Sequence, residues 1–179
     1  MVAFEKYHPL LSPHYTLDWP TASRLKDLYA LRADATQAAL SARPVAQSIT
    51  ETAHAVNHAM RLIMGNQALI YGVTTRKDHA LAGSVALLAI DPALTQAQLQ
   101  VEVAAPTAPA PFYDEIVPRV VGFAFFELGL TTLKLSLPLT PTPLQTWLVA
   151  HGFAPTATGE RLMLTITEAA VADDPHYHF

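Results

Sequence analysis

A proline-rich junction at residues 105–112 constrains the fold of this chain more than any other segment. It reads Ala-Pro-Thr-Ala-Pro-Ala-Pro-Phe and separates an apolar strand pattern from a helix pattern. Strand-to-helix junctions often bind phosphates through free backbone N–H groups, and proline has no N–H group. The junction therefore predicts a poor phosphate cradle.

The residues around the junction predict an antiparallel meander whose last strand is also the first strand of a βαβ unit. Strand patterns at 68–75, 81–90 and 98–104 are closely spaced, which favours antiparallel pairing. An apolar helix is predicted over 112–128, with Gly129 as its C-terminal cap and Pro118 kinking it or marking where its regular part starts. A strand at 131–137 then returns parallel to strand 98–104.

The remaining patterns complete a single α+β domain. We expect helices at 24–32, 50–64 and 143–151, only weak helicity over 33–48, and strands at 14–19 and 161–167. The predicted fold class is an α/β/α sandwich with a mixed, mostly antiparallel sheet and one βαβ crossover. One domain spans 1–179, with its core at about 14–168 and a flexible tail at 169–179.

The composition restricts the classes of function. Hydrophobic residues make up 51% of the chain and charged residues 15%, with a net charge of −4 and no cysteine. Disulfides and thiolate chemistry are excluded, and no Lys or Arg run suggests a nucleic-acid partner. Since no apolar run approaches the ~20 residues of a membrane span, we expect a cytoplasmic protein with no membrane partner. A homodimer is compatible with the sequence.

Three short motifs follow one another in the second half of the chain. They are Leu-Ala-Gly-Ser-Val at 81–85, Gly-Phe-Ala-Phe-Phe-Glu-Leu-Gly-Leu at 122–130 and His-Gly-Phe at 151–153. Together with the order of the elements, these motifs resemble the GNAT N-acetyltransferases, and within them the RimJ/RimL-like group. The resemblance runs from about Tyr15 to Thr167.

The resemblance implies that acetyl-CoA is the co-substrate and that its loop is degenerate here. The family's loop, Q/R-x-x-G-x-G/A, aligns with residues 106–111, and the following aromatic residue and acid are kept as Phe112 and Glu115. Proline replaces the basic or amide residue and both glycines. If each lost charge-assisted bond is worth ~1.5–3 kcal/mol, CoA affinity falls by a few powers of ten. The family's later N-x-x-S motif aligns with Pro141 and Leu144, so it is missing as well.

Candidate site residues cluster at the end of strand 98–104 and in the junction. Glu102 lies on the polar face of that strand and is our candidate general base for the acceptor ammonium, the alternative being an exposed structural glutamate. Tyr113 is a second catalytic candidate, the alternative being a structural tyrosine. The resemblance implies that CoA contacts a larger group: Val103, Ala104, Ala105, Thr107, Ala108, Ala110, Phe112 and Tyr113.

We expect no metal site. His54 and His58 are spaced i, i+4 on the helix at 50–64, but they lack a third ligand at helical spacing. A solvated face or the wall of an acceptor site explains them better. His176 and His178 lie in the tail, where disorder explains them better than metal chelation.

The predicted function is the transfer of an acetyl group from acetyl-CoA to a primary amine of a protein or small molecule. One alternative is a non-catalytic relative that keeps the fold for binding or assembly after losing its CoA site. A third is an enzyme whose acyl donor lacks the nucleotide pyrophosphate. The three prolines favour the first alternative, whereas the retained Phe112 and Glu115 favour the enzyme.

Overall fold

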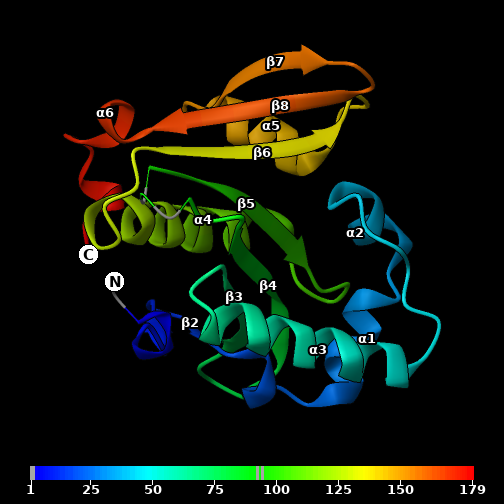
Figure 1. The fold of residues 1–179 in the computed structure, drawn as a ribbon. Coiled ribbons are helices and arrows are strands. Elements are labelled where there is room, and N and C mark those ends of the chain that lie inside the picture. The colour runs from blue at the N-terminus through cyan, green and yellow to red at the C-terminus, as the bar shows by residue number, and fades with distance from the viewer. Residues whose placement is uncertain (1–2, 92, 94) are drawn as a thin grey trace.

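A single mixed sheet of eight strands forms the centre of the described chain, and helices cover both of its faces (Figure 1). The computed structural model describes residues 3–91, 93 and 95–179. The strand order is β1-β2-β3-β4-β5-β6-β8-β7, and every neighbouring pair is antiparallel except β5 and β6. The predicted α+β class and the predicted βαβ crossover are both confirmed.

The elements have the following bounds. The strands are β1 (Leu10–Leu11), β2 (Tyr15–Asp18), β3 (Leu69–Thr75), β4 (Leu81–Leu88), β5 (Gln96–Val103), β6 (Thr132–Pro138), β7 (Ala154–Thr158) and β8 (Arg161–Thr167). The helices are α1 (Leu25–Arg32), α2 (Ala35–Leu40), α3 (Ile49–Met64), α4 (Pro109–Phe126), α5 (Pro143–Ala150) and α6 (Glu168–Val171). Short 3₁₀ turns lie at Phe4–Lys6, Pro20–Ala22 and Pro175–Tyr177.

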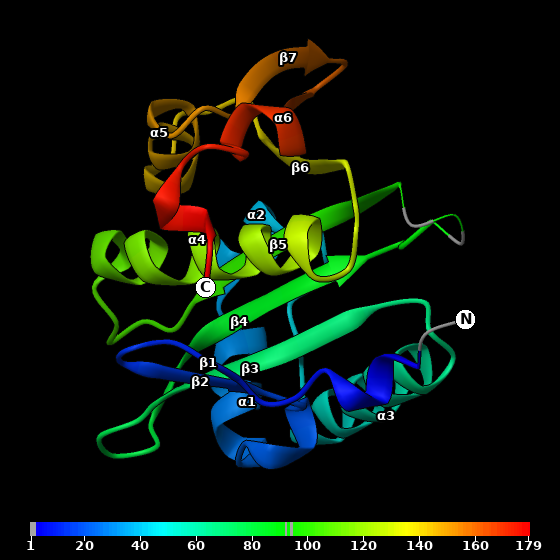
Figure 2. The same ribbon diagram turned by 90° about the vertical axis from the view of Figure 1, so that its left-hand side faces the viewer.

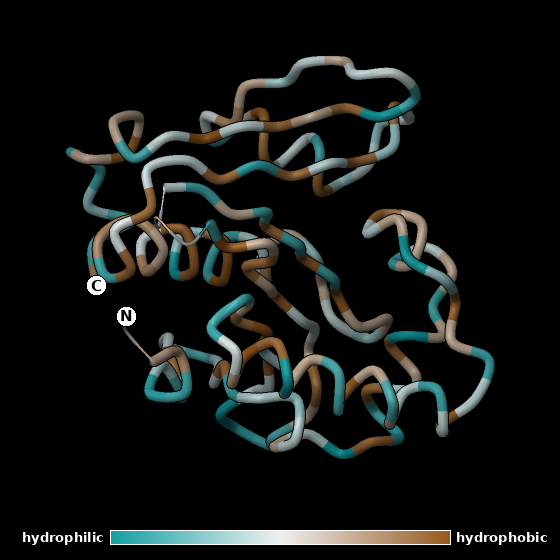
Figure 3. The backbone as a smooth tube through the Cα atoms, in the orientation of Figure 1, coloured by the Kyte–Doolittle hydropathy of each residue, from teal (hydrophilic) through white to brown (hydrophobic). Residues whose placement is uncertain are grey.

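Figure 2 shows α4 on one side of the sheet and α1 and α3 on the other. The hydrophobic segments of the strands and of α4 stand out along the backbone in Figure 3. Helix α4 is the central helix of the core, because nearly every residue from Phe112 to Phe125 that faces the sheet is buried. This packing outweighs Pro118, which lies within α4 without ending it.

Local sequence signals explain where the helices start. Ser48 caps α3 by accepting the Glu51 N–H, while the Glu51 carboxylate accepts the Gln47 N–H. Thr142 caps α5 by accepting the Gln145 N–H. At the end of α4, Gly129 adopts φ +82°, a conformation that glycine tolerates best.

The structure differs from the sequence-based expectations in five places. Helix α2 forms inside the segment 33–48, which was expected to be only weakly helical, and α4 starts three residues before the expected residue 112. Strands β1 and β7 were not predicted, since one is two residues long and the other has no buried residue. The expected flexible tail contains α6 and a 3₁₀ turn, with Val171 and Tyr177 buried.

No helix within the described residues is long and apolar enough to cross a membrane.

Candidate active site

Strands β5 and β6 separate partway along their length. They pair in parallel only over Gln96–Gln98 and Thr132–Lys134, whereas β5 stays paired with β4 as far as Val103. Beyond the last pair, one edge of β5 therefore has no neighbouring strand. A cavity of about 150 Å³ lies there, lined by apolar residues of both strands and by Leu40, Leu144 and Arg161.

Arg161 closes this cavity toward α2. Its guanidinium donates to the Ser136 hydroxyl at 2.8 Å and to the Ser136 carbonyl at 2.9 Å. It also donates to the Leu40 carbonyl at 3.0 Å, at the end of α2. These bonds join β8, β6 and the end of α2 beside the cavity.

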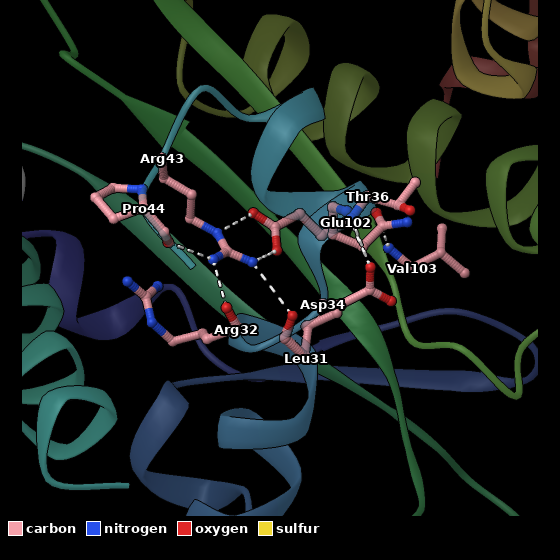
Figure 4. Close-up of polar contacts among 9 residues, drawn as sticks. Leu31, Arg32, Asp34, Thr36, Arg43, Pro44, Glu102 and Val103 are labelled. Atoms are coloured by element: carbon pink, nitrogen blue, oxygen red, sulfur yellow. Dashed lines mark hydrogen bonds and ion pairs between the residues drawn. The ribbon is translucent and has the colours of Figure 1, made fainter. Parts of the chain in front are cut away.

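Glu102 is buried, so it is not the exposed structural glutamate that was the alternative to a catalytic role. Its side chain is 6% exposed and accepts two bonds from the Arg43 guanidinium, at 2.7 Å from Nη2 and 2.9 Å from Nε (Figure 4). Arg43 also donates to the carbonyls of Leu31, Arg32 and Pro44. This ion pair fixes the segment between α1 and α3 against β5.

The N–H of Val103 lies on the unpaired edge of β5. It donates to Gln37 Oε1 at 3.0 Å, whereas the next N–H, that of Ala104, bonds back to Ala82 of β4. Asp34 caps α2 by accepting the N–H groups of Thr36 and Gln37, which fixes the start of this helix. The Gln37 side chain of α2 thus accepts the hydrogen bond of the Val103 N–H group at this edge of the sheet.

The proline junction turns tightly into α4. The Thr107 N–H is used within the turn, since it donates to the Ala104 carbonyl at 2.9 Å. Ala108 is the N-cap, so Pro109 and Pro111 are the first and third residues of α4. Among the described residues, the N–H groups of Ala105 and Ala108 make no hydrogen bond with the protein, and Ala110 carries the one N–H group of the first three residues of α4.

Two aromatic residues follow the junction and have different surroundings. Phe112 is fully buried against Gly83 of β4, so it belongs to the core. Tyr113 is 4% exposed and lies in a groove of about 600 Å³ between α4 and α5, near Trp147. Burial raises the pKa of the Tyr113 hydroxyl, which keeps it protonated at neutral pH.

Searches against known proteins identify this architecture. No protein-family model matches the sequence, and no curated protein sequence is detectably similar. Among solved structures, a spermidine N-acetyltransferase from Vibrio cholerae, solved with CoA and spermine, gives a TM-score of 0.71 at 16% identity, covering 89% of this chain and 98% of that one. A GCN5-related N-acetyltransferase from Brucella melitensis gives 0.74 at 13% identity, covering 90% and 79%.

A third match is the microcin C7 self-immunity acetyltransferase MccE, solved with acetyl-CoA and AMP. Its TM-score is 0.70 at 15% identity, covering 87% of this chain and 93% of that one. The chain has the GNAT fold. At these identities the matches establish the architecture of the chain and leave the roles of its residues open.

Within the GNAT fold, the structure brings most of the predicted site residues to one end of β5. Val103 and Ala104 end the strand, Ala105 and Thr107 form the turn, and Ala108 and Ala110 begin α4. Phe112 lies apart from this group, in the core. The catalytic role of Glu102 and Tyr113 and the contacts to CoA stay predictions.

Sequence reasoning did not single out Gln37, Arg43 and Arg161, which the structure places against Val103, against Glu102 and beside the cavity between β5 and β6. Gln37 and Arg43 come from the segment 33–48, where no apolar periodicity pointed to a packed element. The Asp34 cap followed by the helix-forming run Ala35–Leu40 was the available signal. Within the described residues, no group of three His, Cys, Asp or Glu could hold a metal ion, and both His54 and His58 are exposed.

Glu115, the retained acid of the GNAT resemblance, ties α4 to the turn between β1 and β2. It accepts bonds from the Ser12 hydroxyl, from the His14 N–H at 2.9 Å and from His14 Nδ1 at 2.6 Å. Burial raises the pKa of Glu115, but these hydrogen bonds outweigh burial and hold the pKa below its usual 4.5. The carboxylate is therefore more stable in the folded protein than in the unfolded chain.

This shift predicts an acid-dependent loss of stability. Because the folded pKa is lowered, the contribution of Glu115 is fully present above pH 4.5 and is lost as the pH falls through the folded value. We expect Glu115→Gln to flatten this part of the pH profile of the free energy of unfolding, measured by urea titration. Identical pH slopes for the two proteins would contradict the assignment, and Glu160→Gln, at an exposed position, serves as the control.

Proposed function

We propose that this chain is an N-acetyltransferase that moves an acetyl group from the acetyl-CoA thioester to a primary amine. The observation that carries the proposal is the separation of β5 from β6, which leaves the Val103 N–H on an open edge one residue from a buried carboxylate, Glu102. An edge N–H can hold a thioester oxygen, and a carboxylate on the other face can receive the proton of the amine. The spermidine enzyme and MccE, which share the fold, were solved with CoA or acetyl-CoA.

The residues of the chain fit one part of acetyl-CoA better than another. The open edge of β5 and the groove between α4 and α5 are suited to an extended arm and its terminal groups. At the start of α4, the prolines remove two of the three first-turn donors that a pyrophosphate would use. The proposal therefore assigns affinity chiefly to the thioester arm.

The Val103 N–H can exchange one hydrogen-bond acceptor, the Gln37 side chain, for another, the thioester oxygen. The amide oxygen of Gln37 now takes the Val103 N–H, where the thioester oxygen would bind during transfer. Replacing one neutral acceptor by another costs little hydrogen-bond energy. The Gln37 side chain thereby keeps the donor satisfied whenever no thioester is present.

The proposed transfer uses two ionisable groups of the chain. The amine loses a proton to Glu102, directly or through water, and its nitrogen forms a bond to the acetyl carbon while the carbon–sulfur bond breaks. The departing thiolate takes a proton from Tyr113 or from water, and the second proton that the nitrogen releases replaces the one given up, so that the products are a neutral amide and the CoA thiol. By resemblance to the RimJ/RimL-like group, the acceptor is the amine of a protein or of a small molecule.

A second candidate function is a non-catalytic binding protein with the same fold. Proline at the first and third positions of α4, together with the internal bond of the Thr107 N–H, favours this reading. Calorimetric titration distinguishes the two functions. The enzyme is expected to bind acetyl-CoA and S-acetylpantetheine with similar affinity, because the pyrophosphate contributes little.

Restoring the missing donors tests the same point. We expect Pro109→Ala/Pro111→Ala to tighten acetyl-CoA binding about 10- to 100-fold and to leave S-acetylpantetheine unchanged. Pro175→Ala, in the tail, is the matched control. If the unaltered protein binds neither thioester at about 1 mM, the enzyme proposal fails and the binding-protein reading stands.

A further inference from the structure

A second cavity lies on the face of the sheet that Glu102 occupies. Its volume is about 230 Å³, and it is lined by α1, α3 and the strands β3, β4 and β5. Its walls are mostly apolar, with Leu28 and Leu31 from α1 and Val56, Ala59 and Leu62 from α3. The size suits a small molecule or the end of a peptide.

Five polar side chains line the same cavity. They are Arg32, His58, Ser84, Gln100 and Glu102. The charge of Glu102 is already balanced by the two-bond ion pair with Arg43. His58 is exposed, at the α3 side. The remaining residue with a fixed charge in the lining of this cavity is Arg32.

Arg32 has no partner for its side chain among the described residues. Its Nε is buried and makes no hydrogen bond, although its backbone carbonyl accepts bonds from Arg43 and Ala46. Figure 4 shows the Arg32 guanidinium turned away from the Arg43–Glu102 pair. Burial and the nearby charge of Arg43 lower the pKa of Arg32, and Glu102 offsets this in part.

A buried guanidinium nitrogen without an acceptor is costly, because arginine keeps its charge at any physiological pH. Folded proteins satisfy most such groups. An anion bound in the cavity would supply the missing acceptor. A carboxylate can accept two parallel hydrogen bonds from the planar guanidinium of arginine, whereas a monatomic anion cannot.

We propose that this cavity binds an acceptor that carries a carboxylate, with the carboxylate on Arg32 and an apolar side chain against α1 and α3. This inference rests on the proposed acetyl transfer and names its acceptor class: small amino carboxylates such as amino acids. Each oxygen of Glu102 keeps a lone pair beyond its bond to Arg43, so Glu102 can accept a bond from the amine. Arg32 acts as a binding residue and has no part in proton transfer.

Calorimetric titration with three probes, each with and without CoA, tests the inference. L-Leucine carries the amine, the carboxylate and an apolar side chain, leucinamide lacks the carboxylate, and inorganic phosphate is a different anion. We expect leucine to bind about 10- to 100-fold more tightly than leucinamide. Arg32→Gln is expected to remove this preference, Arg32→Lys to retain part of it, and Arg61→Gln, at an exposed position outside the cavity, to leave it unchanged.

Several outcomes overturn the inference. They are equal binding of leucine and leucinamide, an unaltered preference in Arg32→Gln, phosphate binding as tight as leucine binding, or no leucine binding at about 10 mM. If Arg32→Gln does not fold, the preference of the unaltered protein decides. These titrations measure neither acetyl-CoA binding nor acetyl transfer. If the carboxylate preference is not found, the acetyltransferase proposal still stands. If acetyl-CoA does not bind, the titrations with leucine and leucinamide still show whether the cavity binds a carboxylate.

Discussion

Arg43→Met is expected to lower the free energy of unfolding by about 3–5 kcal/mol. The substitution leaves the Glu102 carboxylate, 6% exposed, without its cation. It also removes the donors to the carbonyls of Leu31, Arg32 and Pro44, which hold the segment between α1 and α3 in place. Urea titration at neutral pH measures the loss.

A double variant separates the ion pair from these backbone bonds. In Arg43→Met/Glu102→Gln the uncompensated charge is gone, so we expect part of the lost stability to return. The exposed pair of Arg24 and Asp27 provides the control, because Arg24→Met should cost less than about 1 kcal/mol. A loss in Arg43→Met no larger than in Arg24→Met would show that the buried pair is not a structural tie.

Gly83→Ala is expected to cost about 3 kcal/mol or more of the free energy of unfolding. A Cβ atom at this position would lie 2.3 Å from the Glu102 carbonyl oxygen and 2.7 Å from Phe112 Cζ. The ring can shift, but the carbonyl belongs to the neighbouring strand, so β4 and β5 must move apart. Thermal and urea unfolding measure the effect.

Gly129→Ala is the comparison for Gly83→Ala. A Cβ at residue 129 would meet no atom within 4 Å, although the φ angle of +82° makes alanine strained there. Its cost should therefore be limited to about 1–2 kcal/mol. Equal losses at the two positions would contradict the close approach of β4 and β5.

The sequence predicted those elements whose pattern and capping agreed. The meander β3-β4-β5, the crossover helix and strand β6 all follow from apolar periodicity and turn residues, and the structure confirms them. Helix α2 was missed because it buries only Ala38 and Leu40, so it has no apolar stripe. Strand β7 was missed because its five residues are all exposed and it is stabilised by pairing with β8 alone.

The candidate site was harder to predict because its contacts join distant segments. The alternation of β5 placed Glu102 on the polar face correctly, but its partner Arg43 lies 59 positions earlier in the chain. The bond between Gln37 and Val103 spans 66 positions. A strand pattern cannot show that a polar residue is buried when the burial depends on a helix folded from elsewhere. The same holds for Arg32, because only the folded chain shows that its side chain has no hydrogen-bond partner among the described residues.

The separation of β5 from β6 also marks where the sheet changes from one continuous stretch of sequence to another. Strands β1 to β5 come from residues 10–103, and strands β6 to β8 come from residues 132–167, so each half is continuous in sequence. The crossover at 104–131 is the single covalent link between the two halves. Proline fixes φ and lowers the number of backbone conformations, so the prolines that weaken the phosphate cradle also stiffen this link. The junction is thus less suited to binding an anion, and it forms a stiffer covalent connection between the two halves of the sheet.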